Sequence, residues 1–131
     1  MFPVCQTEKN MNDKKMVYVV EDDGDISEMI VLLLSNADLE VSASATLSDF
    51  RELLDSQLPD LIVMDVMLPD GNGMDECREL KESSSLKHIP LLLMSAHAQS
   101  HLVISECPAD GFIAKPFDIY DFIDRVKLQL A

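Results

Sequence analysis

Four apolar stretches of this sequence each end in side chains that could take part in chemistry. The stretches are VYVV, LIVM, LLLM and FIA, and the polar residues that follow them are three consecutive acids, a lone aspartate, a serine and a lysine: Glu21, Asp22, Asp23, Asp65, Ser95 and Lys115. Any one of these residues alone is most simply a cap or a turn former. Because the same pattern recurs at four separate places, a shared site is the better explanation of the set.

Carboxylates, a hydroxyl and an ammonium group are a suitable set for phosphoryl transfer. Acidic groups gathered at a partly buried place repel one another and raise their own pKa values, and a divalent cation removes that conflict. Hard oxygen ligands favour Mg²⁺, which keeps several waters and commonly meets a phosphate. With Asp65 as a carboxylate nucleophile and Ser95 and Lys115 beside it, the residues predict magnesium-dependent phosphoryl transfer onto Asp65.

The elements that must position these residues alternate between strand-like and helix-like segments. Strand-like apolar runs cover residues 16–20, 39–43, 60–64, 89–94 and 112–114. Apolar residues at helical spacing begin near Asp25, Leu47, Met74 and Ile119, and a poorer helical stretch covers residues 98–106. Asp25 with Glu28 resembles a capping box, and Asp118 is the expected cap of the last helix.

Strands separated by helices imply right-handed crossovers and a parallel sheet that is covered on both faces. The predicted fold class is therefore α/β, a doubly wound five-stranded parallel sheet in the flavodoxin-like order 2-1-3-4-5. In that order the first and third strands are neighbours, at the point where the winding reverses. Glu21, Asp22 and Asp23 follow the first strand and Asp65 follows the third, so we expect their carboxylates to converge there.

Composition limits the classes of function that fit. A chain of 131 residues has the size of one domain, and its 24 acidic against 10 basic residues give a net charge of −14. That charge disfavours direct binding to nucleic acid, which depends on Lys and Arg. No apolar run is long enough for membrane insertion, and the N-terminus lacks the pattern of a signal peptide. We expect a cytoplasmic protein with a polar, mobile extension over residues 1–15 and one domain over residues 16–131.

The cysteines and histidines do not indicate a disulfide framework or a metal centre. Cys5, Cys77 and Cys107 are odd in number and share no CxxC spacing, so free thiols in a reducing compartment are expected. His97 and His101 lie four residues apart, with Cys107 nearby, and could share a helix face. A zinc site needs a matching second pair of ligands, so two exposed histidines are the better interpretation.

Four stretches carry a family resemblance: VYVVEDDGDI, LIVMDVMLPDGNG, LLLMSAHA and GFIAKPFD. In order and in spacing they resemble the receiver domain of two-component response regulators, over about residues 16–131. The chain looks like a stand-alone receiver of the chemotaxis-regulator kind. The resemblance implies that Asp65 accepts a phosphoryl group from a sensor histidine kinase or a histidine phosphotransfer protein. Phosphorylation would then switch a face that a downstream protein target recognises. Such a protein is a signalling phosphoacceptor that assists only its own phosphorylation and dephosphorylation, not an enzyme in the usual sense.

The resemblance also implies a role for each matching residue. Asp22 would bind Mg²⁺ directly, Glu21 mainly through a coordinated water, and the backbone carbonyl of Met67 would supply another ligand. Asp65 would also face the metal. Ser95 and Lys115 would bind the phosphoryl oxygens.

Other positions match the receiver pattern in backbone conformation or in a residue that changes position on phosphorylation. Phe112 falls where the family has an aromatic residue that turns inward as the serine or threonine moves. Gly73 matches the glycine of the loop after the acceptor, and Lys115–Pro116 is expected to be a cis peptide bond. The fourth helix, over residues 98–106, is expected to be the least stable element. For Asp23 we expect a solvated or capping role.

Three alternatives differ from a stand-alone receiver. A phosphatase of the haloacid dehalogenase type also forms an aspartyl phosphate, but it needs a second aspartate two residues after the nucleophile, where this chain has Met67. A flavin carrier needs a loop after the first strand that cradles phosphate, whereas EDDGD would repel one. The third alternative is a receiver fragment of a larger regulator or hybrid kinase.

Overall fold

The computed structural model describes residues 14–96 and 108–131 of the chain. Several expectations lie outside these residues. They concern the fourth helix, the pair His97 and His101, the thiols of Cys5 and Cys107, and most of the N-terminal extension.

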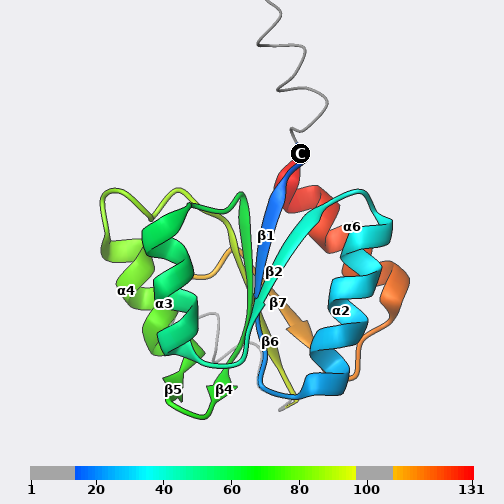
Figure 1. The fold of residues 1–131 in the computed structure, drawn as a ribbon, viewed down its shortest axis with the longest axis horizontal. Helices are drawn as coiled ribbons and strands as arrows, with labels where there is room; N and C mark the ends of the chain where they lie inside the picture. Colours follow the sequence, from blue (N-terminus) through cyan, green and yellow to red (C-terminus); the bar gives the residue numbers. More distant parts are fainter. Residues whose placement is uncertain (1–13, 97–107) are drawn as a thin grey trace, which may run out of the picture.

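Five parallel strands form the central sheet, in the order β2-β1-β3-β6-β7 (Figure 1). The strands are β1 (Met16–Val20), β2 (Glu40–Ser44), β3 (Leu61–Asp65), β6 (Leu91–Ser95) and β7 (Gly111–Ala114). Since β6 and β7 are the fourth and fifth strands of this sheet along the chain, the order is the predicted 2-1-3-4-5. Each strand is parallel to its neighbours. The predicted fold class is confirmed.

Helices cover both faces of the sheet (Figure 1). In the described part of the chain, α2 (Gly24–Asn36) and α6 (Ile119–Leu130) cover one face, and α3 (Leu47–Ser56) and α4 (Gly73–Glu82) cover the other. A small antiparallel hairpin of β4 (Met67–Leu68) and β5 (Gly71–Asn72) follows β3. The sequence did not predict this hairpin, because two-residue strands are too short to show a periodic pattern.

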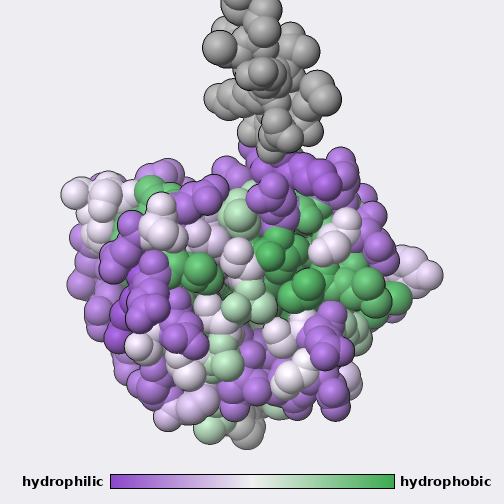
Figure 2. Space-filling view, in the orientation of Figure 1, coloured by the Kyte–Doolittle hydropathy of each residue, from purple (hydrophilic) through white to green (hydrophobic). Residues whose placement is uncertain are grey.

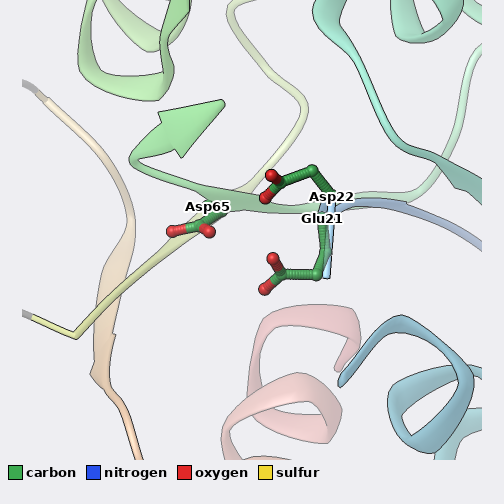
Figure 3. Close-up of side chains that lie close together, drawn as sticks. All are labelled: Glu21, Asp22 and Asp65. Atoms are coloured by element: carbon green, nitrogen blue, oxygen red, sulfur yellow. The ribbon is translucent and has the colours of Figure 1, made fainter. Parts of the chain in front are cut away.

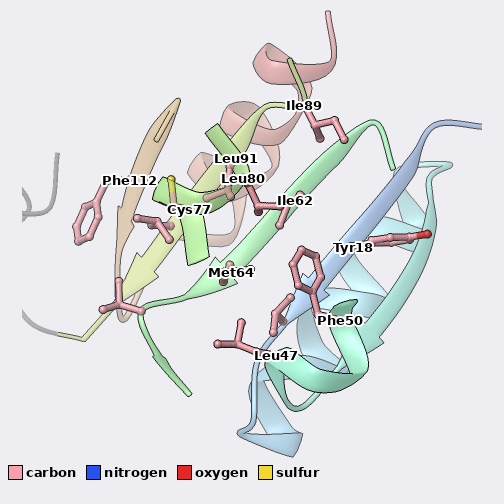
Figure 4. Close-up of a cluster of buried hydrophobic side chains, with 13 residues drawn as sticks. Tyr18, Leu47, Phe50, Ile62, Met64, Cys77, Leu80, Ile89, Leu91 and Phe112 are labelled. Carbon is pink, nitrogen blue, oxygen red and sulfur yellow. The ribbon is translucent and has the colours of Figure 1, made fainter. Parts of the chain in front are cut away.

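The sheet has one apolar cluster on each face, because successive residues of a strand point to opposite sides. On the α3–α4 side, Tyr18, Met64 and Leu93 pack with Phe50 and Cys77, among others (Figure 4). On the α2–α6 side the buried residues are Val17, Val19, Ile30, Leu34, Leu61, Val63, Leu92, Met94, Ile113, Phe122 and Val126. Burial on both faces explains why β3 and β6 are continuously apolar in sequence.

Aspartates cap two of the helices. Asp23 is the N-cap of α2, and its carboxylate accepts hydrogen bonds from two backbone N–H groups of the first turn. The capping role expected for Asp23 is therefore observed, whereas the capping box expected at Asp25 and Glu28 was wrong, because the helix begins two residues earlier. Asp118 caps α6 as predicted.

None of the helices in residues 14–96 and 108–131 combines the length and apolar character needed to span a membrane.

Candidate functional site

Three carboxylates meet at the carboxyl ends of β1 and β3. Val20 of β1 pairs with Met64 of β3, so Glu21 follows β1 at the level where Asp65 ends β3. One carboxylate oxygen from each of Glu21, Asp22 and Asp65 lies within 4.8 Å of the other two (Figure 3). The strand order thus brings together the three acids that the sequence singled out.

The ammonium group of Lys115 bridges the two buried carboxylates of this cluster. Glu21 and Asp65 are only 2% and 8% exposed, whereas Asp22 is exposed. Lys115 Nζ donates to Glu21 Oε1 at 2.5 Å and to Asp65 Oδ2 at 3.1 Å. A buried charge is tolerated only where it is paired and hydrogen-bonded, so Lys115 makes the burial of both acids possible.

Burial and neighbouring charges shift the pKa values of Glu21 and Lys115 in this cluster. Burial raises the pKa of Glu21, and the charge of Asp65 adds to this, although hydrogen bonds from Lys115 and from the backbone N–H of Asp23 act against it. Burial alone would lower the pKa of Lys115, but hydrogen bonds to Glu21 and Asp65, together with their charges, outweigh it and raise that pKa. Three carboxylates and one ammonium group leave two negative charges, which is the charge that a divalent cation would neutralise.

The alternation of side chains along the strands explains which groups meet. The residues two positions before Glu21, Asp65 and Lys115 all belong to the core beneath α2 and α6: Val19, Val63 and Ile113. The three charged side chains therefore lean to the same side of the sheet.

Ser95 and Phe112 belong to the opposite side of the sheet. Ser95 follows Leu93, which is part of the core beneath α3 and α4, and Phe112 pairs with Leu93 and lies in the same core. Ser95 is buried at the end of β6, and its carbonyl oxygen accepts a hydrogen bond from the backbone N–H of Lys115 at 2.8 Å. The structure thus places Ser95 at the same edge of the sheet as Asp65, on the face that carries Phe112.

The backbone after Asp65 folds back closely against it. The N–H of Gly73 donates to the carbonyl of Val66 at 2.7 Å, and a Cβ atom at Gly73 would lie only 2.3 Å from the carbonyl oxygen of Asp65. Glycine is therefore required where α4 begins. Between these points the backbone of Met67 pairs with Asn72, and its N–H lies 3.5 Å from Asp65 Oδ1.

A pocket of about 520 Å³ adjoins the lysine end of the site, and its lining is mostly apolar: Ile26, Met29, Ala96, Lys115, Pro116 and Phe117. The Lys115–Pro116 peptide bond that shapes this edge is cis, as the sequence resemblance implied.

Sequence reasoning missed two contacts of carboxylates outside the cluster of Glu21, Asp22 and Asp65. The carboxylate of Asp70 accepts hydrogen bonds from the backbone at the start of α3. The buried carboxylate of Glu76 on α4 accepts two hydrogen bonds from Arg51 on α3, at 2.5 and 3.1 Å. Each contact joins residues more than twenty positions apart, so no local spacing could have indicated it.

Comparison with known proteins agrees with this geometry. A family model for the response regulator receiver domain matches residues 17–127. The chain belongs to this family. The receiver is 30% identical over 118 residues to the transcriptional regulatory protein GltR of Pseudomonas aeruginosa, covering 88% of this chain and 49% of that protein. It is 31% identical over 123 residues to the DNA-binding response regulator MtrA of Mycobacterium tuberculosis, covering 89% and 51%. The receiver thus spans about half the length of these curated relatives.

Solved structures support the same assignment. The signal receiver domain of a signal transduction histidine kinase from Syntrophus aciditrophicus has a TM-score of 0.83 and 28% identity, with 88% of this chain and 89% of that chain covered. The non-phosphorylated HemR receiver domain from Leptospira biflexa has a TM-score of 0.79 and 32% identity, with 90% and 95% covered. The receiver family predicted from the four sequence stretches is therefore confirmed, and the chain is a module of two-component signalling.

Proposed function

We propose that residues 16–131 form a receiver that accepts a phosphoryl group on Asp65 from a phosphohistidine of a partner protein, in a reaction that requires Mg²⁺. The observation that carries this proposal is the cluster of Glu21, Asp22 and Asp65 bridged by Lys115. Phosphorylation would change a protein-interaction face, so the chain acts as a signalling switch and not as an enzyme with a separate substrate.

The donor set of the cluster fits Mg²⁺. Three carboxylates within 4.8 Å, with two negative charges left after Lys115 is counted, are the hard oxygen ligands that this cation prefers. Asp22 and Asp65 would bind it directly, Glu21 through a water molecule, and Met67 through its backbone carbonyl. When bound, the cation neutralises charge as the phosphoryl group approaches.

The protein's own groups then have distinct tasks in the transfer. A carboxylate oxygen of Asp65 bonds to phosphorus while the bond from phosphorus to the partner's histidine nitrogen breaks, and the histidine leaves with the electron pair. Lys115, which already contacts Asp65, and Ser95, at the end of the adjacent strand, would donate hydrogen bonds to the phosphoryl oxygens. Movement of Ser95 toward the phosphoryl group would be followed by Phe112, which lies on the same face of the sheet.

The surface beside the site suits a protein phosphodonor. The pocket next to Lys115 is lined by the apolar side chains of Ile26, Met29 and Phe117. Hydrophobic side chains also gather on the α2 side of the molecule, where Met29 and Leu32 are exposed (Figure 2). Exposed apolar patches of this kind mark protein-interaction sites, so a sensor histidine kinase or a histidine phosphotransfer protein would cover this surface while it reaches Asp65.

The charge of the chain supports protein partners in preference to nucleic acid. The names of GltR and MtrA describe transcriptional or DNA-binding regulators, of which this chain matches about half. The net charge of the 131 residues is −14. Phosphates would be repelled by such a surface, so we propose that these residues do not contact nucleic acid directly.

The proposal is tested by incubating the protein with Mg²⁺ and acetyl phosphate and measuring the intact mass. We expect addition of one phosphoryl group, located on Asp65 by peptide mapping, and dependence of the labelling on Mg²⁺. The variant Asp65→Asn should fold and remain unlabelled. Labelling of that variant at the wild-type level, or absence of labelling in the wild type, would overturn the proposal.

A further inference from the structure

Asp70, at the tip of the β4–β5 hairpin, joins the loop after the phosphoacceptor to the start of α3. Its Oδ1 accepts a hydrogen bond from the backbone N–H of Leu47 at 2.8 Å, and its Oδ2 accepts one from Ser48 at 3.0 Å. The first N–H groups of a helix have no partner within the helix, and the positive end of the helix dipole favours a carboxylate. A loop residue thus satisfies two backbone groups of a helix that lies more than twenty positions earlier in the chain.

The same helix already has a cap of its own. Thr46 is the N-cap of α3, and its Oγ1 accepts a hydrogen bond from the backbone N–H of Asp49 at 3.1 Å. Capping of α3 therefore does not by itself require Asp70. What Asp70 adds is a connection between α3 and the hairpin.

Packing reinforces this connection. A Cβ atom at Gly71 would lie 2.7 Å from Cδ1 of Leu47, which is a buried residue of the first turn of α3. The hairpin therefore rests directly on α3. Backbone hydrogen bonds, from Leu47 above all, lower the pKa of Asp70, so its carboxylate is charged at neutral pH.

The hairpin needs such an anchor because it is very short. Its two strands have two residues each, and pair only Met67 with Asn72 and Leu68 with Gly71. A two-stranded hairpin is marginally stable on its own, even when it is longer than this one. Met67 lies in this hairpin between Asp65, at the end of β3, and Asp70, which is hydrogen-bonded to the start of α3. These two points together fix the backbone of Met67.

We propose that Asp70 is a positioning residue, which anchors the β4–β5 hairpin to the N-terminus of α3 and so holds the backbone carbonyl of Met67 at the magnesium site. This inference rests on the proposed function, because that function assigns the carbonyl to the metal. Asp70 itself touches neither the metal nor the phosphoryl group.

The test compares Asp70→Ala with Thr46→Ala by titrating each protein with Mg²⁺ alone, followed by backbone amide NMR shifts. Both variants lose capping of α3, but only Asp70→Ala releases the hairpin. We expect Asp70→Ala to weaken Mg²⁺ binding roughly tenfold, the lower end of the loss seen when partners of metal ligands are removed. Thr46→Ala should bind Mg²⁺ like the wild type. Asp70→Asn keeps one acceptor oxygen, so it should recover part of the affinity.

Phosphorylation by acetyl phosphate gives a second measurement. In Asp70→Ala the Mg²⁺ concentration for half-maximal labelling should rise by the same factor, while the labelling rate at saturating Mg²⁺ stays close to that of the wild type. Equal loss of Mg²⁺ affinity in Asp70→Ala and Thr46→Ala would show that Asp70 is only a helix cap, and no loss in either would show that the hairpin positions itself. If Asp70→Ala does not fold, the comparison is made with Asp70→Asn, for which wild-type affinity would overturn the inference. A wild type that binds no Mg²⁺ would refute the proposed function instead.

Discussion

Replacing Lys115 by methionine would remove the ammonium group that bridges Glu21 and Asp65 and keep most of the apolar side chain. The two carboxylates would then face each other inside the protein without a positively charged partner. We expect Lys115→Met to destabilise the fold strongly in the absence of metal. This outcome would be unusual for loss of a lysine, because exposed ion pairs contribute little to stability.

The magnitude follows from the distances and the burial. Lys115 Nζ lies 2.5 Å from Glu21 Oε1 and 3.1 Å from Asp65 Oδ2. At an effective dielectric constant of about 20, two unit charges at such distances attract each other with roughly 5–7 kcal/mol. Most of this attraction is offset, because taking the ammonium group out of water costs several kcal/mol. On balance, removing one partner of a buried ion pair lowers stability by about 3–5 kcal/mol. Since the side chains of Lys115 and Asp65 are still 12% and 11% exposed, we expect a loss at the lower end, about 3 kcal/mol.

The loss should depend on pH in a defined direction. The pKa of Glu21 is raised by burial, and it should rise further once Lys115 is gone. An acid whose folded-state pKa lies above its unfolded value lowers stability as the pH rises through that window. The variant should therefore be most destabilised above the folded-state pKa of Glu21 and recover as the carboxyl is protonated. The pKa of Lys115 is raised in the wild type, so its contribution persists through neutral pH and is lost only at alkaline pH.

Urea unfolding near pH 5 and near pH 8, without and with millimolar Mg²⁺, measures these effects. Lys127→Met is the matched control, because Lys127 is exposed on α6 and its loss should leave stability almost unchanged. Mg²⁺ should restore part of the stability of Lys115→Met by neutralising the unpaired acids. If Lys115→Met stays within about 1 kcal/mol of the wild type at both pH values, the argument that Lys115 compensates two buried carboxylates is wrong.

Two further substitutions test the metal cluster and the backbone behind it. Asp22→Ala should lose most of the rise in melting temperature that Mg²⁺ gives the wild type, because it removes one of the three converging carboxylates; equal rises in both proteins would contradict the metal site. Gly73→Ala should lower the unfolding free energy by about 3 kcal/mol or more, because its Cβ would lie 2.3 Å from the carbonyl oxygen of Asp65. Gly24→Ala is the control, since a Cβ there meets nothing within 4 Å; similar losses in the two glycine variants would refute the close approach.

The strands were predictable from the sequence because buried parallel strands are continuously apolar. The first strand was predicted with its observed bounds, and the others were displaced by one or two residues. The predicted third strand ended before Asp65 and the predicted fourth strand ended before Ser95. A polar side chain was treated as the end of each strand. In the structure both residues are still in the sheet, since Val66 N–H donates to the carbonyl of Met94 and Lys115 N–H donates to the carbonyl of Ser95. Strand length depends on the backbone and not on the polarity of the last side chain.

The residues of the site were predictable for a related reason. The order of parallel strands fixes which carboxyl ends are neighbours, so Glu21, Asp22 and Asp65 could be placed together from the sequence. The contacts of Asp70 and Glu76 could not be predicted in this way. Each depends on how a loop or helix packs on another element, and neither leaves a periodic signal in the sequence.

Because Lys115 and Ser95 lie on different sides of the sheet, we propose different tasks for them. Lys115 reaches Asp65 from the α2–α6 side and is already bonded to Glu21 and Asp65. Ser95 belongs to the α3–α4 side, together with Phe112. A phosphoryl group carries close to two negative charges, more than the carboxylate oxygen to which it is attached, so it should draw Lys115 away from Glu21. On one side of the sheet, then, phosphorylation would redistribute an ion pair that exists beforehand. On the other side it would require Ser95 to move, and we propose that this movement would be coupled to Phe112, which lies on the same side of the sheet.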